Sequence, residues 1–65
     1  MKVNGQKIKA LRERKNISRT DLATAADLGE RRIQQVEDAM SIKMNLNVAK
    51  AVALKLGVKL ETIAR

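Results

Sequence analysis

The sequence ISRTDLATAADLGERRIQQVED, residues 17–38, decides the fold because it predicts two short helices joined by a tight turn. Ser18 is followed three residues later by an acid, which resembles a capping box and predicts a helix over about 19–26. The next three residues, 27–29, include a glycine and break the helical pattern. A second helix is predicted over about 30–38. The rest of the chain should therefore pack around this helical corner.

Each of these two helices has one apolar side. In the first helix the residues expected in the core are Leu22, Ala23 and Ala26. In the second helix, at about 100° per residue, Ile33 and Val36 define the inward side and Glu37 lies close to it. The outer side and its flanks carry Arg31, Arg32, Gln34, Gln35 and Asp38. The second helix thus exposes arginine and glutamine, although residues 27–38 have a net charge of −2.

The flanking sequence also predicts helices. The chain has no proline and three glycines, and no run of residues alternates at the period of a strand, so we expect an all-α fold. Further helices are predicted over about 5–15 and 45–56 and around 60–63, with Gly57 as a left-handed C-cap. The first helix should place on one face Ile8, Leu11, Arg12 and Lys15. The fourth should bury Val48, Ala49, Val52, Ala53 and Leu56. The prediction is a compact single domain of five helices over residues 1–65.

Composition excludes several classes of protein. Sixty-five residues allow one small core, and the absence of cysteine and histidine excludes disulfides, thiolate metal sites and a histidine base. The chain has no apolar run of about 20 residues to cross a bilayer, and its charged start is unlike a signal peptide. No glycine-rich phosphate loop or convergent set of carboxylates indicates an enzyme. We therefore expect a cytoplasmic protein, at the nucleoid if bacterial or phage, with no cofactor, no metal and no evident small-molecule ligand.

The charge indicates a polyanionic partner. The chain has a net charge of +7, and residues 1–16 alone carry +5. Such an excess favours binding to phosphates with release of counterions, although lysine-rich solubility is the simple alternative. The chain has no Phe, Tyr or Trp, and sites for single-stranded nucleic acids usually stack bases on aromatic rings. Duplex DNA is therefore the better expectation.

Two short helices with a three-residue connection and a polar outer face are the layout of a helix-turn-helix, here about 18–38. With IKALRERKN before residues 17–38 and VAKAVALKLGVKLETI after them, the chain resembles the Cro/CI-type (Xre-like) DNA-binding domains over nearly its whole length. The resemblance implies the lambda-repressor-like five-helix fold and a transcriptional regulator, with a repressor as the leading expectation. It also implies a two-fold operator in double-stranded DNA, read by a weak homodimer or by two copies that meet on the DNA. The chain could also be a fragment of a longer repressor.

The pair Arg12 and Glu37 is expected to be structural. Arg12 lies on the apolar face of the first helix, and a carboxylate near the inward side of the third helix demands a cationic partner. The family that the chain resembles has an ion pair between the same two positions. Both arguments predict that these side chains meet.

The residues expected to contact bases are Glu30, Arg31, Arg32, Gln34 and Gln35. An arginine can donate two hydrogen bonds to guanine, and a glutamine can pair both amide groups with adenine, each for about 1–3 kcal/mol of discrimination. The flanking Arg32 and Gln34 reach either bases or phosphates. Glu30 either accepts from cytosine or favours the positive end of its helix.

Phosphate contacts are expected from Ser18, Arg19 and Lys43. The first two follow from the family, in which the start of the second helix abuts a phosphate. The carry-over to Lys43 is weaker, because the loop after the third helix is about two residues longer than the common pattern. Residues 39–44 are expected to take their own path, as an extra turn of helix, with their large apolar residues in the core or in a dimer contact. Asp27 replaces the usual turn glycine of the family, and it tolerates a left-handed conformation less easily.

A second function remains open at the level of sequence. The same fold could serve as an antitoxin-like or adaptor module whose third helix binds a protein. The strength of binding to duplex DNA across a salt series discriminates the two functions.

Overall fold

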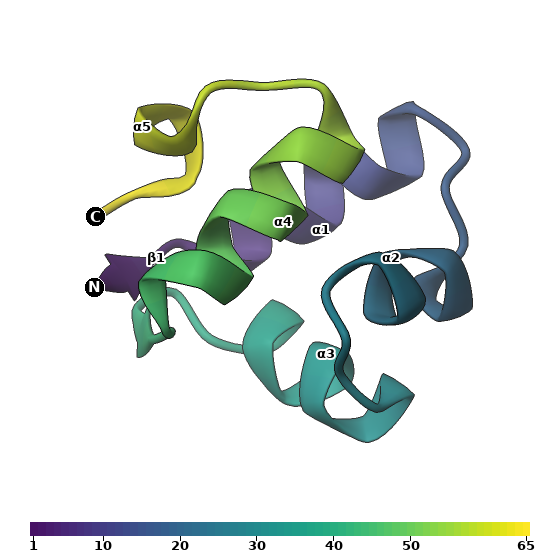
Figure 1. Cartoon of the computed structure of the whole chain (residues 1–65), viewed down its shortest axis with the longest axis horizontal. Coiled ribbons are helices and arrows are strands. Elements are labelled where there is room, and N and C mark those ends of the chain that lie inside the picture. The colour runs from purple at the N-terminus through teal and green to yellow at the C-terminus, as the bar shows by residue number, and fades with distance from the viewer.

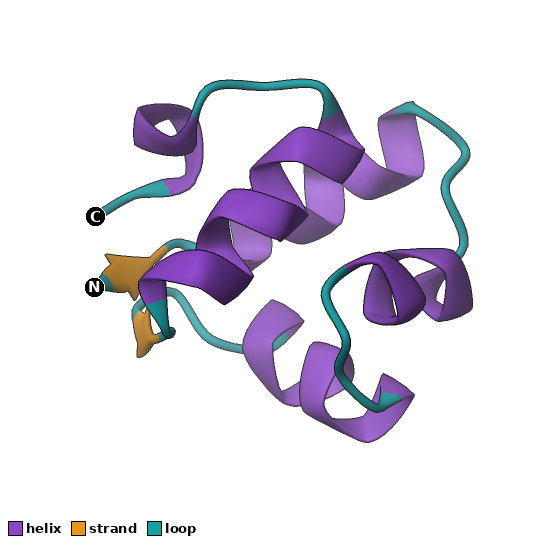
Figure 2. Ribbon diagram, in the orientation of Figure 1, coloured by secondary structure: helices purple, strands orange, loops and turns teal.

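The structure, a computed structural model, describes residues 1–65 and consists of five helices and a small sheet (Figures 1 and 2). In chain order the elements are β1 (Lys2–Val3), α1 (Gly5–Arg14), α2 (Arg19–Ala25), α3 (Glu30–Glu37), β2 (Ile42–Lys43), α4 (Leu46–Leu56) and α5 (Leu60–Ile63). The expected five-helix fold is confirmed, and each helix ends within a residue or two of its predicted bounds. The helices α1 and α4 cross the middle of the molecule, and α3 forms one edge of it (Figure 1).

Local hydrogen bonds explain where the helices begin and end. The Ser18 hydroxyl oxygen accepts a hydrogen bond of 2.9 Å from the Asp21 amide at the start of α2. Asn4 and Asn45 cap α1 and α4 in the same way. Gly57 ends α4 with φ +70°, a conformation that a residue without a Cβ adopts at little cost. The predicted caps at Ser18 and Gly57 are therefore confirmed.

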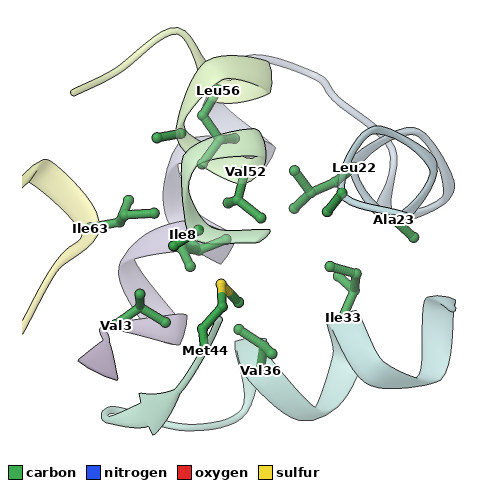
Figure 3. Close-up of a cluster of buried hydrophobic side chains, with 13 residues drawn as sticks. Val3, Ile8, Leu22, Ala23, Ile33, Val36, Met44, Val52, Leu56 and Ile63 are labelled. Atoms are coloured by element: carbon green, nitrogen blue, oxygen red, sulfur yellow. The ribbon is translucent and has the colours of Figure 1, made fainter. Parts of the chain in front are cut away.

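Thirteen buried hydrophobic side chains form one core, drawn in Figure 3. The apolar residues predicted to face inward from α2 and α3 are all in it, and each is at most 3% exposed. Ile63 of α5 is fully buried, so this short helix closes the core against α4 as expected. One position that was predicted to be buried differs: Val48 is half-buried. The helix α1 ends at Arg14, one residue before its predicted end.

Residues 39–44 do not form the extra helical turn that was expected. They contain β2, which pairs antiparallel with β1 in the register Lys2↔Lys43 and Val3↔Ile42. The reason is long-range: β1 offers unpaired backbone groups, and the Met44 amide donates to the Met1 carbonyl at 2.7 Å. The three large apolar residues of the segment have different environments, because Met44 is buried, Ile42 is half-buried and Met40 is 60% exposed.

The connection from α2 to α3 contains a strained residue. Asp27 has φ +56°, so it occupies the left-handed conformation for which the family usually has a glycine. This conformation reverses the chain at once, and the Leu28 amide reaches back to the Ala23 carbonyl at 2.8 Å. The turn thereby sets the position of α3 against α2.

Candidate DNA interface

The helix α3 presents a polar face on the outside of the molecule. Ile33 and Val36 anchor it, each 1% exposed, and point from α3 towards α2 and α4 in Figure 3. The opposite side exposes Arg31, Gln34 and Gln35. The helix has eight residues and is about 12 Å long. No other part of the chain covers these side chains, so they are accessible to a ligand along the length of the helix.

Glu30, at the start of α3, is partly engaged within the protein. Its carboxylate accepts a hydrogen bond from the Thr20 hydroxyl of α2. This contact ties the first turns of the two helices together on the exposed side of the corner. The sequence does not predict this role of Thr20, because its contact with Glu30 depends on the angle between α2 and α3.

Arg32 lies on the flank of α3 and forms two hydrogen bonds within the chain. Its Nη1 donates to Gln35 Oε1 at 2.8 Å, and its Nη2 lies 3.4 Å from the Lys43 carbonyl oxygen. A guanidinium has only donors, so the Gln35 amide must turn its oxygen to Arg32 and its NH₂ group away. The contact orients Gln35, and it connects α3 to β2.

Glu37, at the end of α3, is brought together with Arg12 of α1 as expected. The carboxylate is 2% exposed, and its Oε2 lies 2.6 Å from Arg12 Nε while Oε1 accepts from Nη2 at 3.3 Å. The Arg12 Nη1 donates to the Ile17 carbonyl at 2.9 Å, at the entry to α2. The hydrogen bond to Glu37 outweighs desolvation by burial and raises the pKa of Arg12 above its ordinary value. Arg12 therefore stays charged and joins α1, α3 and the entry to α2.

Arg19, the first residue of α2, has a neighbour that the sequence does not reveal. Its Nε is buried, lacks a hydrogen bond and lies 3.5 Å from Glu37 Oε1, whereas its side chain as a whole is 40% exposed. The start of α2 and the end of α3 meet here, which only the three-dimensional arrangement shows. Arg19 thus combines an inward cationic contact with a partly exposed side chain.

The other two residues expected at phosphates are exposed. The Ser18 hydroxyl oxygen is occupied by the α2 cap, and its hydrogen remains available to an anion. Lys43 lies in β2, which follows α3, and its carbonyl oxygen lies 3.4 Å from Arg32 Nη2. The expected base and phosphate residues thus lie on α3, on the start of α2 and on β2.

Comparison with protein families identifies the fold. A helix-turn-helix family model of the Cro/CI/Xre type matches residues 8–63 and so covers most of the chain. A search of curated proteins found no match to the chain. None of its helices is long and apolar enough to pass through a membrane. The chain therefore belongs to the Cro/CI-type (Xre-like) helix-turn-helix family of DNA-binding regulatory domains.

Proposed function

We propose that this protein binds specific sequences in duplex DNA and represses transcription, with α3 lying in the major groove. The observation that carries the proposal is the free face of α3, on which Arg31, Gln34 and Gln35 are exposed. The major groove is about 12 Å wide and admits a helix with its side chains. The net charge of +7 supports attraction to phosphates.

The contact at Arg32 sharpens the proposed roles on α3. Because Gln35 turns its oxygen to Arg32, its NH₂ group is free to donate to acceptors such as adenine N7 or guanine O6 and N7. Arg31 is free of protein partners and is the leading candidate for a bidentate contact with guanine. Glu30, Arg32 and Gln34 complete the proposed base-reading set, and the Thr20 hydroxyl restrains the Glu30 carboxylate.

The proposed phosphate contacts come from the start of α2 and from the strand β2 that follows α3. Ser18 and Arg19 stand at the start of α2, where backbone amides also point outward. Lys43 stands in β2, where its backbone contacts Arg32 of α3. Two copies on a two-fold operator would place their α3 helices about 34–36 Å apart, one turn of DNA.

Selection from random duplexes tests this proposal. The wild-type chain, Arg31→Ala and Gln35→Ala are each used to select binding sites, with Lys55→Ala as a control that removes a charge from α4. We expect the two α3 variants to lose preference at one or two base pairs and to bind about 5- to 150-fold more weakly, as 1–3 kcal/mol per contact implies. Lys55→Ala should select the wild-type motif. An unchanged motif and affinity for both α3 variants would rule out this face as the reader.

The alternative function is an adaptor or antitoxin-like module whose α3 binds a protein. A salt series with mixed duplex DNA separates the two, because the logarithm of the binding constant of a DNA binder falls with the logarithm of salt concentration at about −0.9 per phosphate contacted. Absence of measurable binding near physiological salt, also to selected duplexes, would favour the adaptor.

A further inference from the structure

The strand β1 lies between β2 and a second extended segment, Ala64 and Arg65, which follows α5. On one side β1 pairs with β2. On the other side Val3 forms an antiparallel bridge with Ala64, flanked by hydrogen bonds from Asn4 N to Ile63 O at 2.8 Å and from Arg65 N to Lys2 O at 2.9 Å. Ala64 and Arg65, which follow α5, therefore lie alongside β1 on the side away from β2. Figure 1 shows both chain ends on this side of the molecule.

This register places three cationic residues in one row. The bridge between Val3 and Ala64 puts Lys2 opposite Arg65, and the pairing of β1 with β2 puts Lys2 opposite Lys43. Val3 is fully buried, so its neighbour Lys2 and the two residues opposite Lys2 face solvent. We call Lys43, Lys2 and Arg65 the cationic row.

The cationic row is costly for the sheet itself. The hydrogen bond from Met44 N to Met1 O flanks Lys2 and Lys43, which makes them a non-hydrogen-bonded pair with Cα atoms about 4.5 Å apart and side chains close together. Like charges in such a pair destabilise a sheet. Both ion pairs of the chain involve Glu37, so no member of the row forms an ion pair with a carboxylate. Lysines often protect the edges of sheets, but Lys2 lies in the middle segment, where no edge needs protection.

The cationic row adjoins α3 through the connection that follows this helix. Arg32 of α3 lies 3.4 Å from the Lys43 carbonyl oxygen, and Arg65 Nη1 lies 3.3 Å from the Met40 carbonyl oxygen. The row crosses two gaps between strands, each about 4.8 Å, so it spans roughly 10 Å. Three successive phosphates of one DNA strand advance about 7 Å along the axis, at 3.4 Å each. Successive phosphates also advance around the axis, so three of them lie further apart than their axial advance, at a spacing that long, flexible side chains on a row of this span can match.

We propose that Lys2, Lys43 and Arg65 form one binding site for consecutive backbone phosphates of the DNA strand that borders the groove occupied by α3. This proposal rests on the proposed function and adds Lys2 and Arg65 to the interface. The site neutralises phosphates and reads no bases, so it contributes equally to all duplex sequences.

Two triple variants with the same change of charge test the cationic row. The row variant is Lys2→Gln/Lys43→Gln/Arg65→Gln. The control variant, Lys15→Gln/Lys55→Gln/Lys59→Gln, removes three positive charges from the edge opposite α3. There Lys15 Nζ lies beside Gly57, and the connection from α4 to α5 follows that edge (Figure 1). Binding to a selected duplex and to a mixed duplex is measured from low to high salt for both variants and the wild type.

We expect the log–log slope of the row variant to be less steep by about 0.9 for each phosphate that it no longer neutralises, and so by about 2.7 for all three. At about 0.1 M salt this corresponds to about eightfold weaker binding per phosphate, by the same factor for both duplexes. Its melting temperature at low salt should equal or exceed that of the wild type, because the repulsion within the row is gone.

If the binding constants of the row and control variants fell with salt at equal log–log slopes, the proposal that the cationic row binds phosphates would be wrong. The proposed function would remain intact, because the wild type would still bind and select DNA. The same holds if the row variant loses affinity for the selected duplex alone. A wild-type chain without salt-dependent binding to any duplex would overturn the proposed function and the row together.

Discussion

At the scale of single residues, Glu37 is a carboxylate buried between two cationic side chains. It is 2% exposed, it ends α3, and cationic groups of α1 and α2 lie against its two oxygens. A carboxylate in such a place is stable only while its partners remain. The alignment of α3 on the other helices therefore depends on one buried charge network.

Replacing Arg12 by methionine should destabilise the fold by about 3 kcal/mol, because the buried Glu37 carboxylate would lose its closest partner and retain only Arg19, at 3.5 Å. Urea unfolding of the wild type and the variant measures the difference. The matched control is the double variant Arg12→Met/Glu37→Met, which removes both charges and should recover most of the stability. An unchanged free energy of unfolding in Arg12→Met would show that the pair has no structural role.

The sequence predicts correctly whether a side chain is buried or exposed where this depends on the geometry of a single helix. The inward positions of Ile33, Val36 and Glu37 follow from the helical period, and so does the exposure of Arg31. The approach of Arg19 to Glu37 and of Thr20 to Glu30 depends on how two helices are placed, for which the sequence has no periodic signal.

At the scale of elements, the helices could be predicted and the strands could not. Serine, asparagine and glycine caps mark helix ends through local hydrogen bonds, so these ends are readable in the chain. The strands β1 and β2 have two residues each, too few to show an alternating pattern. Each strand forms because it pairs with the other, which is distant in sequence. The prediction of an extra helical turn in residues 39–44 was wrong because the sequence does not reveal this pairing.

The close approach of α1 to the end of α3 depends on Gly5. A Cβ at this residue would overlap the Val36 carbonyl oxygen and lie 2.7 Å from the Ala39 carbonyl oxygen, and the Gln6 amide donates to that same Ala39 oxygen at 3.1 Å. The backbone itself is in the way, so no side-chain rotation relieves the overlap. Gly5 thereby determines how far α3 stands from α1.

We expect Gly5→Ala to lower the free energy of unfolding by about 2–3 kcal/mol, because α1 and α3 must move apart. Thermal unfolding followed by circular dichroism measures the change, and a destabilisation of this size lowers the melting temperature by about 10 °C or more. Gly29→Ala is the control, since its Cβ would meet no atom within 4 Å. Similar melting temperatures for the two variants would contradict the proposed close packing.

At the scale of the whole molecule, the sheet connects parts of the chain that are far apart in sequence. Val3 is fully buried, and its strand pairs with residues 42–43 on one side and bridges Ala64 on the other. The start of the chain, the connection after α3 and the residues after α5 are thereby joined at one place. The position of β2 beside α3 is thus held by residues at both ends of the chain, which lie outside α2 and α3.

Val3→Ala should reduce the free energy of unfolding by about 2 kcal/mol, because two buried methyl groups are removed where both neighbouring segments meet. Urea unfolding provides the measurement. Leu54→Ala removes more apolar atoms, but Leu54 is 82% exposed, so this control should change stability by less than about 0.5 kcal/mol. Equal effects for the two variants would mean that β1 contributes nothing to the stability of the core.

The sheet also has a consequence for the order of folding. The helices α2 and α3 are neighbours in the chain and can pack after closing a short loop, whereas the bridge from Val3 to Ala64 closes nearly the entire chain. The native contacts of β1 should consequently form after the rate-limiting step, with φ-values near zero. Substitutions in β1 would then leave the folding rate almost unaltered and increase the unfolding rate. The native contacts of β1 would thus slow the unfolding of the protein.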